Sequence, residues 1–417
     1  MTRPVDLVDI FKDLVRLDTT NPPGNERIAA DYLASILAEH GIASEIVEPE
    51  PSRASIVARI GPERGKPPVV LISHLDVVAA EPAEWTHPPF DAVERDGIIY
   101  GRGTLDTKYL TAIELGALLA LRDAELDRPV YFVATADEEQ GSSLGMPHVA
   151  DRWADAFAGG VVVNEGGGFY VEHPAGPFHL CTAGEKGRCR FAVTLRGSAG
   201  PSSFPADDPA MPKLVALLER MAAREFPPEE NAVSARYDEL LDGSWEHPFL
   251  RAFREYNRRD AFILKRFDAG SQVNVLPHEI TFEAELQLLP SHDRAYAEAV
   301  LAEVFGGLDV EWEIAEFRPG FISRLDGEAF ASLERGAREH LDGARLLPGF
   351  ALGQTDGRFL GALGCDVYGF GPVTRAVPFS EVLTLVHQTD EKIPRESIDV
   401  GTAILERLIR DLGKVSA

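Results

Sequence analysis

Positively charged side chains are scarce in this chain of 417 residues, which has 41 Lys and Arg against 67 Asp and Glu. The resulting formal charge of -26 argues against nucleic acid and anionic membranes as partners, because both require clustered cations. Most of the carboxylates are expected to form a solvated acidic surface, which favours solubility and does not by itself indicate a fold.

Cysteine and long apolar runs are also lacking. Cys181, Cys189 and Cys365 are too few and too scattered for a disulfide framework or a Cys-rich zinc site, so we expect buried free thiols in a reducing cytoplasm. No run approaches the roughly 18 apolar residues of a membrane span. The N-terminal segment MTRPVDLVDIFKDLV carries early acidic residues and indicates an amphipathic helix rather than a signal peptide. The sequence therefore predicts a soluble cytoplasmic protein.

The length exceeds that of one ordinary hydrophobic core, so two domains are expected. In the first part, apolar β-rich runs at residues 55–60, 68–73, 130–136 and 161–164 alternate with helical patterns, including a long one at 104–125. Continuous apolar strands that alternate with helices indicate an α/β domain with a mainly parallel sheet. In such sheets, ligands bind beyond the carboxyl ends of the strands.

The pattern restarts near residue 187 with a further set of strands and helices, which resembles a βαβ arrangement and could close a small sheet of its own. We therefore predict that residues 187–316 form an inserted smaller α+β domain. Residues 1–186 and 317–417 would then form the main domain together, ending in a helix over the segment SIDVGTAILERLIRDLG.

Metal-ligand side chains follow the predicted strands of the main domain, each just past a strand end or in a loop. The segments are ISHLDVV, YGRGTLDTK, ATADEEQG, VVVNEGGG and LVHQTDEKIP, and they contain His74 and Asp76, Asp106, Glu138 and Glu139, Glu165, and His387. One such residue alone is usually a surface or capping residue. Five such segments in one α/β domain indicate a common site.

Two imidazoles and three carboxylates suit a pair of zinc ions, with one His and one carboxylate on each ion and one carboxylate shared. The short, rigid Asp106 is the natural bridge. Asp76 is expected to hydrogen-bond the His74 imidazole and to fix its tautomer. Of the adjacent Glu138 and Glu139, one can bind metal while the other accepts a proton from a metal-bound water.

These motifs make the sequence similar to the co-catalytic zinc amidohydrolases that include aminoacylase, acetylornithine deacetylase, succinyl-diaminopimelate desuccinylase and glutamate carboxypeptidase. The resemblance runs from about residue 10 to the carboxyl terminus and is strongest over HLDVV, DGIIYGRGTLDTK and ADEEQGS. It implies that His74 and Glu165 bind one zinc, that Glu139 and His387 bind the other, and that Asp106 bridges them. It also implies that Glu138 is the general base, and that the inserted domain serves as lid and dimerisation domain.

By the same resemblance, Asn274 in QVNVLP and the segment GQTDGRF with Asp356 and Arg358 would contact the substrate. An arginine can hold a carboxylate through two parallel hydrogen bonds, which agrees with that role. The alternatives are an interdomain or surface salt bridge for Arg358 and a turn-stabilising role for Asn274.

Two positions depart from the family's pattern. Pro201, in RGSAGPSSFP, replaces a histidine that normally helps to stabilise the oxyanion, and Gln287, in AELQLLP, stands where an arginine is common. Ser202, Ser203, His247 or His278 could replace the missing donor. Both departures indicate a divergent substrate, a slower enzyme, or a different donor recruited from elsewhere.

The sequence thus predicts a dinuclear zinc hydrolase, with cobalt or manganese as possible metals, that cleaves an amide bond in a small peptide or an N-acyl amino acid. A homodimer formed through the inserted domain is expected from the resemblance. The alternative is a non-catalytic, metal-containing binding protein derived from this family. A phosphoester hydrolase is disfavoured, because no Lys/Arg cluster for holding phosphate is evident.

Overall fold

The computed structural model of the chain describes residues 6–204, 206–243, 247–271 and 274–413. These residues form two compact units, one made of the chain up to residue 184 and from 323 onward, the other of residues 185–322. The predicted insertion of residues 187–316 lies within the second unit. In the described part of the chain, no helix has the length and apolar character needed to cross a bilayer.

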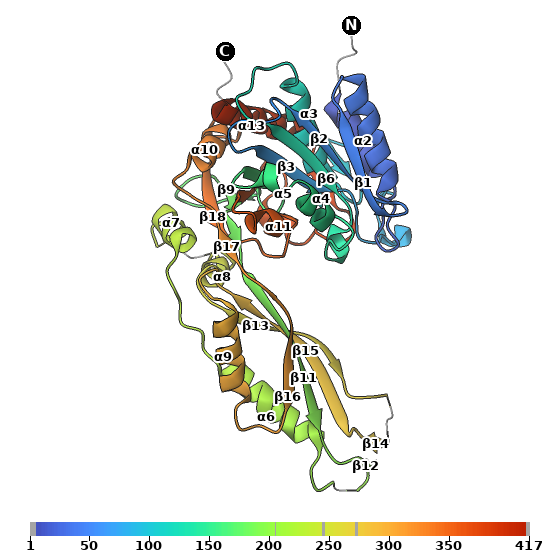
Figure 1. Cartoon of the computed structure of the whole chain (residues 1–417), viewed down its shortest axis with the longest axis vertical. Coiled ribbons are helices and arrows are strands. Elements are labelled where there is room, and N and C mark those ends of the chain that lie inside the picture. The colour runs from blue at the N-terminus through green and yellow to red at the C-terminus, as the bar shows by residue number, and fades with distance from the viewer. Residues whose placement is uncertain (1–5, 205, 244–246, 272–273, 414–417) are drawn as a thin grey trace. The chain divides into compact units, whose positions relative to one another are not determined.

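The first unit is built on a nine-stranded sheet whose main path runs β1-β2-β6-β3-β7-β19-β9-β18, with β8 paired to β9 (Figure 1). The bounds of its strands are β1 (Ser44–Glu50), β2 (Arg53–Ile60), β3 (Val69–His74), β6 (Val130–Thr135), β7 (Val161–Asn164), β8 (Tyr170–Val171), β9 (Phe178–Thr182), β18 (Arg345–Gly349) and β19 (Asp366–Gly369). A smaller sheet joins β4 (Val93–Arg95), β5 (Ile98–Tyr100) and β20 (Lys392–Pro394).

The centre of the large sheet is parallel, as predicted. Strands β6, β3, β7 and β19 run in one direction. On one side of this group β2 pairs antiparallel with β6, and on the other side β9 pairs antiparallel with β19. Every residue of β3, β6 and β7 is buried, which explains why these strands are continuous apolar runs instead of alternating ones.

Helices cover both faces of this sheet. On one side, α2 (Arg27–Glu39) packs on β1 and β2, and α3 (Lys108–Ala120) packs on β3 and β6. The helices α1 (Leu7–Arg16), α10 (Glu328–His340) and α13 (Glu396–Gly413) complete this layer by packing on α3 or on one another (Figure 1). On the other side lie α4 (Met146–Arg152), α5 (Ala154–Phe157) and α11 (Gly357–Gly361). The helix α3 has no polar face because it is covered on all sides.

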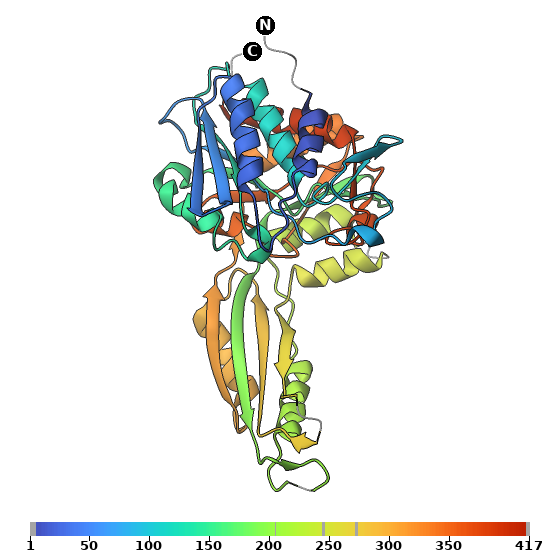
Figure 2. The same cartoon turned by 90° about the vertical axis from the view of Figure 1, so that its right-hand side faces the viewer.

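The second unit contains a four-stranded sheet in the order β13-β15-β11-β16, with α6 and α9 on one face (Figure 2). Its elements are β11 (Gly187–Arg196), β12 (Gly200–Pro201), α6 (Ala210–Ala223), α7 (Ala232–Leu241), α8 (Pro248–Tyr256), β13 (Ala261–Asp268), β14 (Val275–Leu276), β15 (Glu279–Leu288), α9 (Arg294–Phe305) and β16 (Glu311–Arg318). Alternate residues of β11 are buried against α6 and α9, with Phe191 and Phe282 at the centre of the core.

The expected βαβ-like arrangement of this unit is wrong, because all of its neighbouring long strands pair antiparallel. The sequence pattern did not reveal β13, whose residues are mostly half-buried or exposed. This additional strand follows β11 and precedes β15 along the chain, and it lies at one edge of the sheet. Because β13 and β15 are antiparallel neighbours, the chain enters β15 in the direction opposite to that of β11.

Candidate functional site

The metal-type side chains predicted from the sequence meet at one edge of the large sheet. His74 is the last residue of β3, Glu138 and Glu139 lie in the 3-10 turn (Glu138–Gln140) that follows β6, and Glu165 follows β7. These three strands are parallel neighbours, so their carboxyl ends lie side by side.

Two further segments bring the remaining side chains to this edge. Asp106 precedes α3, and His387 lies between α12 (Phe379–Val382) and β20. All six side chains belong to the first unit.

Asp106 lies between the two histidines and offers one oxygen to each. Its Oδ1 is 3.0 Å from His74 Nε2, and its Oδ2 is 3.1 Å from His387 Nε2. Glu165 Oε2 is 3.4 Å from His74 Nε2, and Glu139 Oε2 is 3.1 Å from His387 Nε2. Five of the six side chains therefore form two His-carboxylate groups that share Asp106, and Glu138 belongs to neither.

These spacings fit divalent metal ions. Ligand atoms roughly 2.0–2.1 Å from a tetrahedral zinc are roughly 3.3 Å apart, close to the separations within each group. The donor set agrees, because carboxylates and imidazoles are ordinary zinc ligands. Within the part of the chain that the structure describes, the buried Glu139 Oε1 has no hydrogen-bond partner, so this oxygen is a further atom available to coordinate a metal ion.

The carboxylates of the cluster affect one another's protonation. The pKa of Glu138 lies well above its usual value, because burial disfavours the charged form and the Glu165 carboxylate adds repulsion. Hydrogen bonds to Asp106 and Glu139 raise the pKa of His387 to about 10. Four acidic side chains gathered around two imidazoles thus carry an excess of negative charge that bound cations would compensate.

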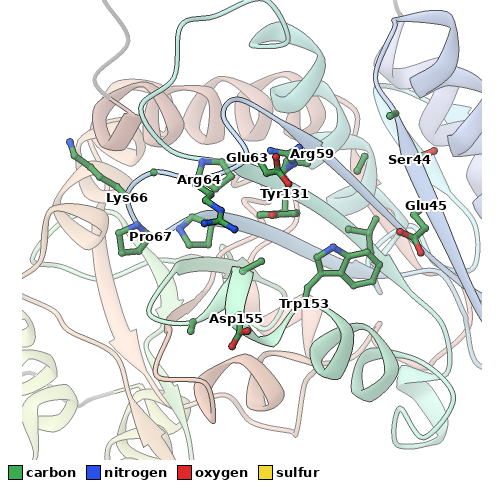
Figure 3. Close-up of a pocket in the computed structure, with 18 residues that line it drawn as sticks. Ser44, Glu45, Arg59, Glu63, Arg64, Lys66, Pro67, Tyr131, Trp153 and Asp155 are labelled. Carbon is green, nitrogen blue, oxygen red and sulfur yellow. The ribbon is translucent and has the colours of Figure 1, made fainter.

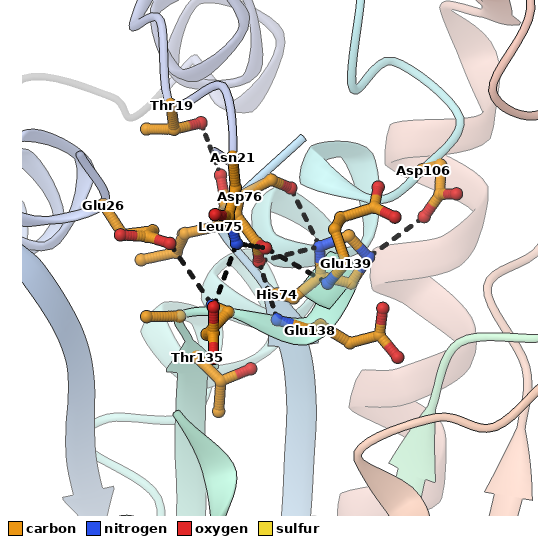
Figure 4. Close-up of polar contacts among 12 residues, drawn as sticks. Thr19, Asn21, Glu26, His74, Leu75, Asp76, Asp106, Thr135, Glu138 and Glu139 are labelled. Carbon is orange, nitrogen blue, oxygen red and sulfur yellow. Dashed lines mark hydrogen bonds and ion pairs between the residues drawn. The ribbon is translucent and has the colours of Figure 1, made fainter. Parts of the chain in front are cut away.

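Asp76 supports the cluster by contacts that partly differ from those expected (Figure 4). His74 Nδ1 lies 2.9 Å from the backbone oxygen of Asp76, and 3.5 Å from its carboxylate. The backbone carbonyl is therefore the closer partner of the imidazole. The carboxylate instead accepts hydrogen bonds of 3.1 Å from the backbone N–H groups of both Glu138 and Glu139. Asp76 thus connects the loop after β3 to the turn after β6.

The N-terminal segment contributes buried contacts that the sequence motifs did not indicate. Asn21 donates from Nδ2 to the carboxylates of Asp76, at 2.9 Å, and of Asp137, at 3.1 Å. Arg53 in turn forms buried ion pairs with Glu26 and Asp137. Figure 4 shows Asn21 pointing at Asp76 beside the metal-type residues. This network holds Asp137, the residue directly before Glu138, in place.

Glu391 is a second residue that sequence reasoning missed. Its buried carboxylate accepts hydrogen bonds from the backbone N–H groups of Gly103, Leu105 and Asp106, and it pairs with Arg102 at 2.7 Å. The Asp106 loop is therefore held by a carboxylate located four residues after His387. The only signal in the sequence was an acidic residue four positions after a predicted ligand, because its burial is seen only in the structure.

The three predicted substrate contacts lie in different surroundings. The Arg358 guanidinium donates to the backbone oxygens of Thr355 and Gly141 and to Ser142 Oγ. The buried Asp356 carboxylate accepts from Thr135 and Ser142, both at 2.6 Å. Asn274 belongs to the second unit, where its backbone oxygen accepts from Ser202 N–H. Contact with substrate stays a prediction for all three.

The two departures from the family pattern both lie in the second unit. Pro201 is in β12 and pairs with Val275 of β14, directly after Asn274. Gln287 lies on β15 opposite Arg188, and its amide is 3.4 Å from Glu285. His247 caps the first turn of α8 through Nδ1, and the backbone oxygen of His278 accepts from Gly197.

A pocket of about 410 Å³ opens directly onto the metal-type cluster, which supplies five of its lining residues (Asp106, Glu138, Glu139, Glu165 and His387). This volume is within the range of small-molecule sites. Most of its other walls are apolar, and they include Phe169, Leu180, Leu352, Phe379 and Leu383.

A larger hollow of about 900 Å³ lies elsewhere on the first unit, near the amino ends of β3 and β6 (Figure 3). Its walls carry charges of both signs, several of them already paired, as Lys66 is with Asp127 and Glu45 is with Arg152. Since none of the metal-type residues lines it, the smaller pocket is the candidate active site.

Comparison with known proteins agrees with this geometry. Residues 70–411 match peptidase family M20/M25/M40. The chain is 26% identical to a probable succinyl-diaminopimelate desuccinylase of Staphylococcus aureus, over 95% of this chain and 96% of that protein. It is also 26% identical to an N-fatty-acyl-amino acid synthase/hydrolase of Xenopus tropicalis, over 97% and 85% of the two chains.

Among solved structures, the M20 family metallo-carboxypeptidase Sso-CP2 from Sulfolobus solfataricus has the same fold, with a TM-score of 0.75 and 17% identity. The similarity covers 99% of this chain and 100% of the other. The family match spans most of the sequence and includes all six clustered side chains. From its sequence and its fold alike, this chain belongs to peptidase family M20/M25/M40 and is a metal-dependent hydrolase.

Proposed function

We propose that the protein hydrolyses an amide bond in an N-acyl amino acid or a short peptide, with two divalent metal ions held by the clustered side chains. The observation that carries this proposal is the position of Asp106, whose two carboxylate oxygens each face a different histidine. One group would consist of His74 and Glu165, the other of Glu139 and His387, with Asp106 shared.

Bound metal ions of this kind acidify a water molecule and polarise a carbonyl group. Glu138 has the properties of the proton carrier. Its carboxylate lines the pocket and, among the described residues, has no hydrogen-bond partner, so it is free to accept a proton from the attacking water. The same carboxyl group would then protonate the leaving nitrogen as the C–N bond breaks.

Asp76 would keep this carboxylate in position. By accepting hydrogen bonds from the N–H groups of Glu138 and Glu139, it fixes the turn that carries the proton carrier and a metal ligand side by side. Two adjacent glutamates can then perform different tasks, because their side chains leave the turn in different directions.

The relatives suggest two kinds of acyl group. One relative is named for removal of a succinyl group and the other for fatty-acyl amino acids. Both names agree with hydrolysis of an amide that joins an acyl group to an amino acid.

The test is release of free amine from N-acyl amino acids and dipeptides by the metal-loaded protein, with metal content measured on the same samples. We expect Glu138→Gln to retain two metal ions per chain and to lose roughly 10²–10⁴-fold in kcat, the contribution usual for general acid–base catalysis. We expect Asp106→Ala to lose metal as well as activity. Near-normal turnover by the Glu138 variant would refute the mechanism. Two bound metals without turnover of any amide by the wild type would favour a metal-containing binding protein.

A further inference from the structure

The walls of the candidate active-site pocket combine the charged cluster and a large apolar surface with three uncharged polar residues, Thr107, Gln354 and Thr355. All of its charged lining residues belong to the metal-type cluster. Beyond the cluster, the described lining residues include nine apolar or aromatic side chains, Leu105, Tyr109, Phe169, Leu180, Leu352, Phe379, Val382, Leu383 and Val386. No lysine or arginine is among the residues that the structure assigns to these walls.

Nearby cations are engaged elsewhere in the first unit. Arg358 donates to two backbone oxygens and to Ser142, Arg102 is buried against Glu391, and Lys392 pairs with Glu381 at 2.6 Å. A carboxylate on the substrate would therefore find no cationic partner in the apolar part of the pocket. Burying an unpaired charge is much less favourable than burying an alkyl group.

Side chains of the apolar wall also pack against one another, which restricts their movement. Phe169 and Phe379 stack with their ring centroids 5.4 Å apart and their planes 8° from parallel. Leu180 and Val382 of the same wall are almost completely buried. By contrast, Leu352 and Leu383 are each 46% exposed, so they would gain contacts when an apolar group covers them.

We propose that this wall binds an uncharged, apolar group of the substrate next to the scissile amide, and that succinyl and other acidic groups are rejected there. This inference rests on the proposed amide hydrolysis and specifies its substrate class. The apolar group can belong to the acyl part of the substrate or to the side chain of its amino acid, and the two sources are separated by the substrates chosen.

The first substrate series varies the acyl group on a constant amino acid and compares N-acetyl, N-butanoyl, N-hexanoyl and N-succinyl derivatives. Butanoyl and succinyl have the same number of carbons, so they differ mainly by the terminal carboxylate. We expect kcat/KM to rise about fourfold for each CH₂ group that becomes buried, and to be at least 100-fold higher for butanoyl than for succinyl. The second series keeps the acetyl group and compares leucine with aspartate, with the same preference expected if the wall binds the amino-acid side chain.

Two variants test the assignment to this wall. Leu352→Lys and Leu383→Lys place a cation at its exposed rim, where folding should be little affected. Each is expected to lower the preference for the apolar over the acidic substrate by at least tenfold. Val215→Lys is the matched control, because Val215 is 49% exposed on α6 of the second unit, and it should leave that preference unchanged. Calorimetric binding of the same ligands to metal-loaded Glu138→Gln gives a second readout that does not depend on turnover.

The outcomes separate this inference from the proposed function. Glu138-dependent hydrolysis with equal or better use of the succinyl and aspartyl substrates would overturn the inference and leave the proposed function intact. An apolar preference that neither rim variant reduces would also overturn it. If no amide is cleaved and no ligand binds, both the function and the inference are wrong.

Discussion

The buried carboxylate of Glu391 accepts a hydrogen bond from the backbone N–H of Asp106 at 2.9 Å, although the two residues are 285 positions apart in the sequence. The same carboxylate binds two further N–H groups of the loop, those of Gly103 and Leu105. The proposed bridging ligand is therefore positioned by the segment that also carries His387.

This contact predicts that Glu391→Gln weakens metal binding without removing a ligand. An amide offers one acceptor oxygen instead of two and directs N–H donors at a loop that already presents donors. We expect a 10- to 100-fold loss of zinc affinity, as is usual when a group that orients a ligand is changed, measured by competition with a chromophoric chelator. Glu328→Gln, which removes only an exposed ion pair with Arg335, is the control and should bind zinc normally. Unchanged affinity in the Glu391 variant would show that the loop holds its position without this carboxylate.

Metal removal should destabilise the protein because the clustered carboxylates then repel one another. A chelator is expected to lower the melting temperature, and added zinc to restore it, since a ligand present at 100 times its dissociation constant stabilises the native state by about 2.7 kcal/mol. Differential scanning fluorimetry with and without chelator measures this. In Asp106→Ala the response to chelator should be much smaller, and an equally large response would contradict the assignment of the ligands.

His179 is expected to make the first unit sensitive to mild acid. Burial in β9 lowers the pKa of this histidine to about 4, against about 6.5 in an unfolded chain. The unfolded state therefore binds more protons between these values, so that stability is complete above pH 6.5 and is lost as the pH falls toward 4. Between pH 7.5 and 5 the loss from this group is about 2 kcal/mol.

The measurement for His179 is urea unfolding of the wild type and of His179→Gln at both pH values. The variant loses a fixed amount of stability at each pH, but its further decrease at pH 5 should be smaller by about 2 kcal/mol. The acidic cluster contributes equally to both proteins and cancels in the difference. Equal pH dependence would mean that His179 is protonated in the folded protein.

The family resemblance implies a homodimer. The second unit exposes two apolar side chains on an edge strand, which would suit such an interface. Leu264 and Phe267 are 46% and 47% exposed on β13, an edge strand of the four-stranded sheet. Apolar edge strands are ready to pair with another chain. Light scattering should give twice the chain mass for the wild type, and the double variant Leu264→Lys/Phe267→Lys should give the mass of one chain. A monomeric wild type would contradict the expectation.

Much of the site was predictable because it depends on a simple rule of parallel sheets. His74, Glu138 and Glu165 each follow an apolar run, and the carboxyl ends of adjacent parallel strands meet at one edge. By contrast, Glu391 and Asn21 act on backbone groups or carboxylates far away in the sequence, and no local pattern identifies such contacts. The parallel centre of the large sheet was equally predictable, because its fully buried strands are continuous apolar runs in the sequence. Strand β13 was missed because its exposed and half-buried residues give no clear alternation.

The ligands of the candidate site are spread along the chain from His74 to His387, with the whole second unit between Glu165 and His387. During synthesis on the ribosome, a chain that has already folded its inserted unit would still lack one of the two histidines and the Glu391 support for the Asp106 loop. The group that contains His387 is then completed only near the end of synthesis, and a chain terminated before His387 would lack activity even if it retained four of the five proposed ligands.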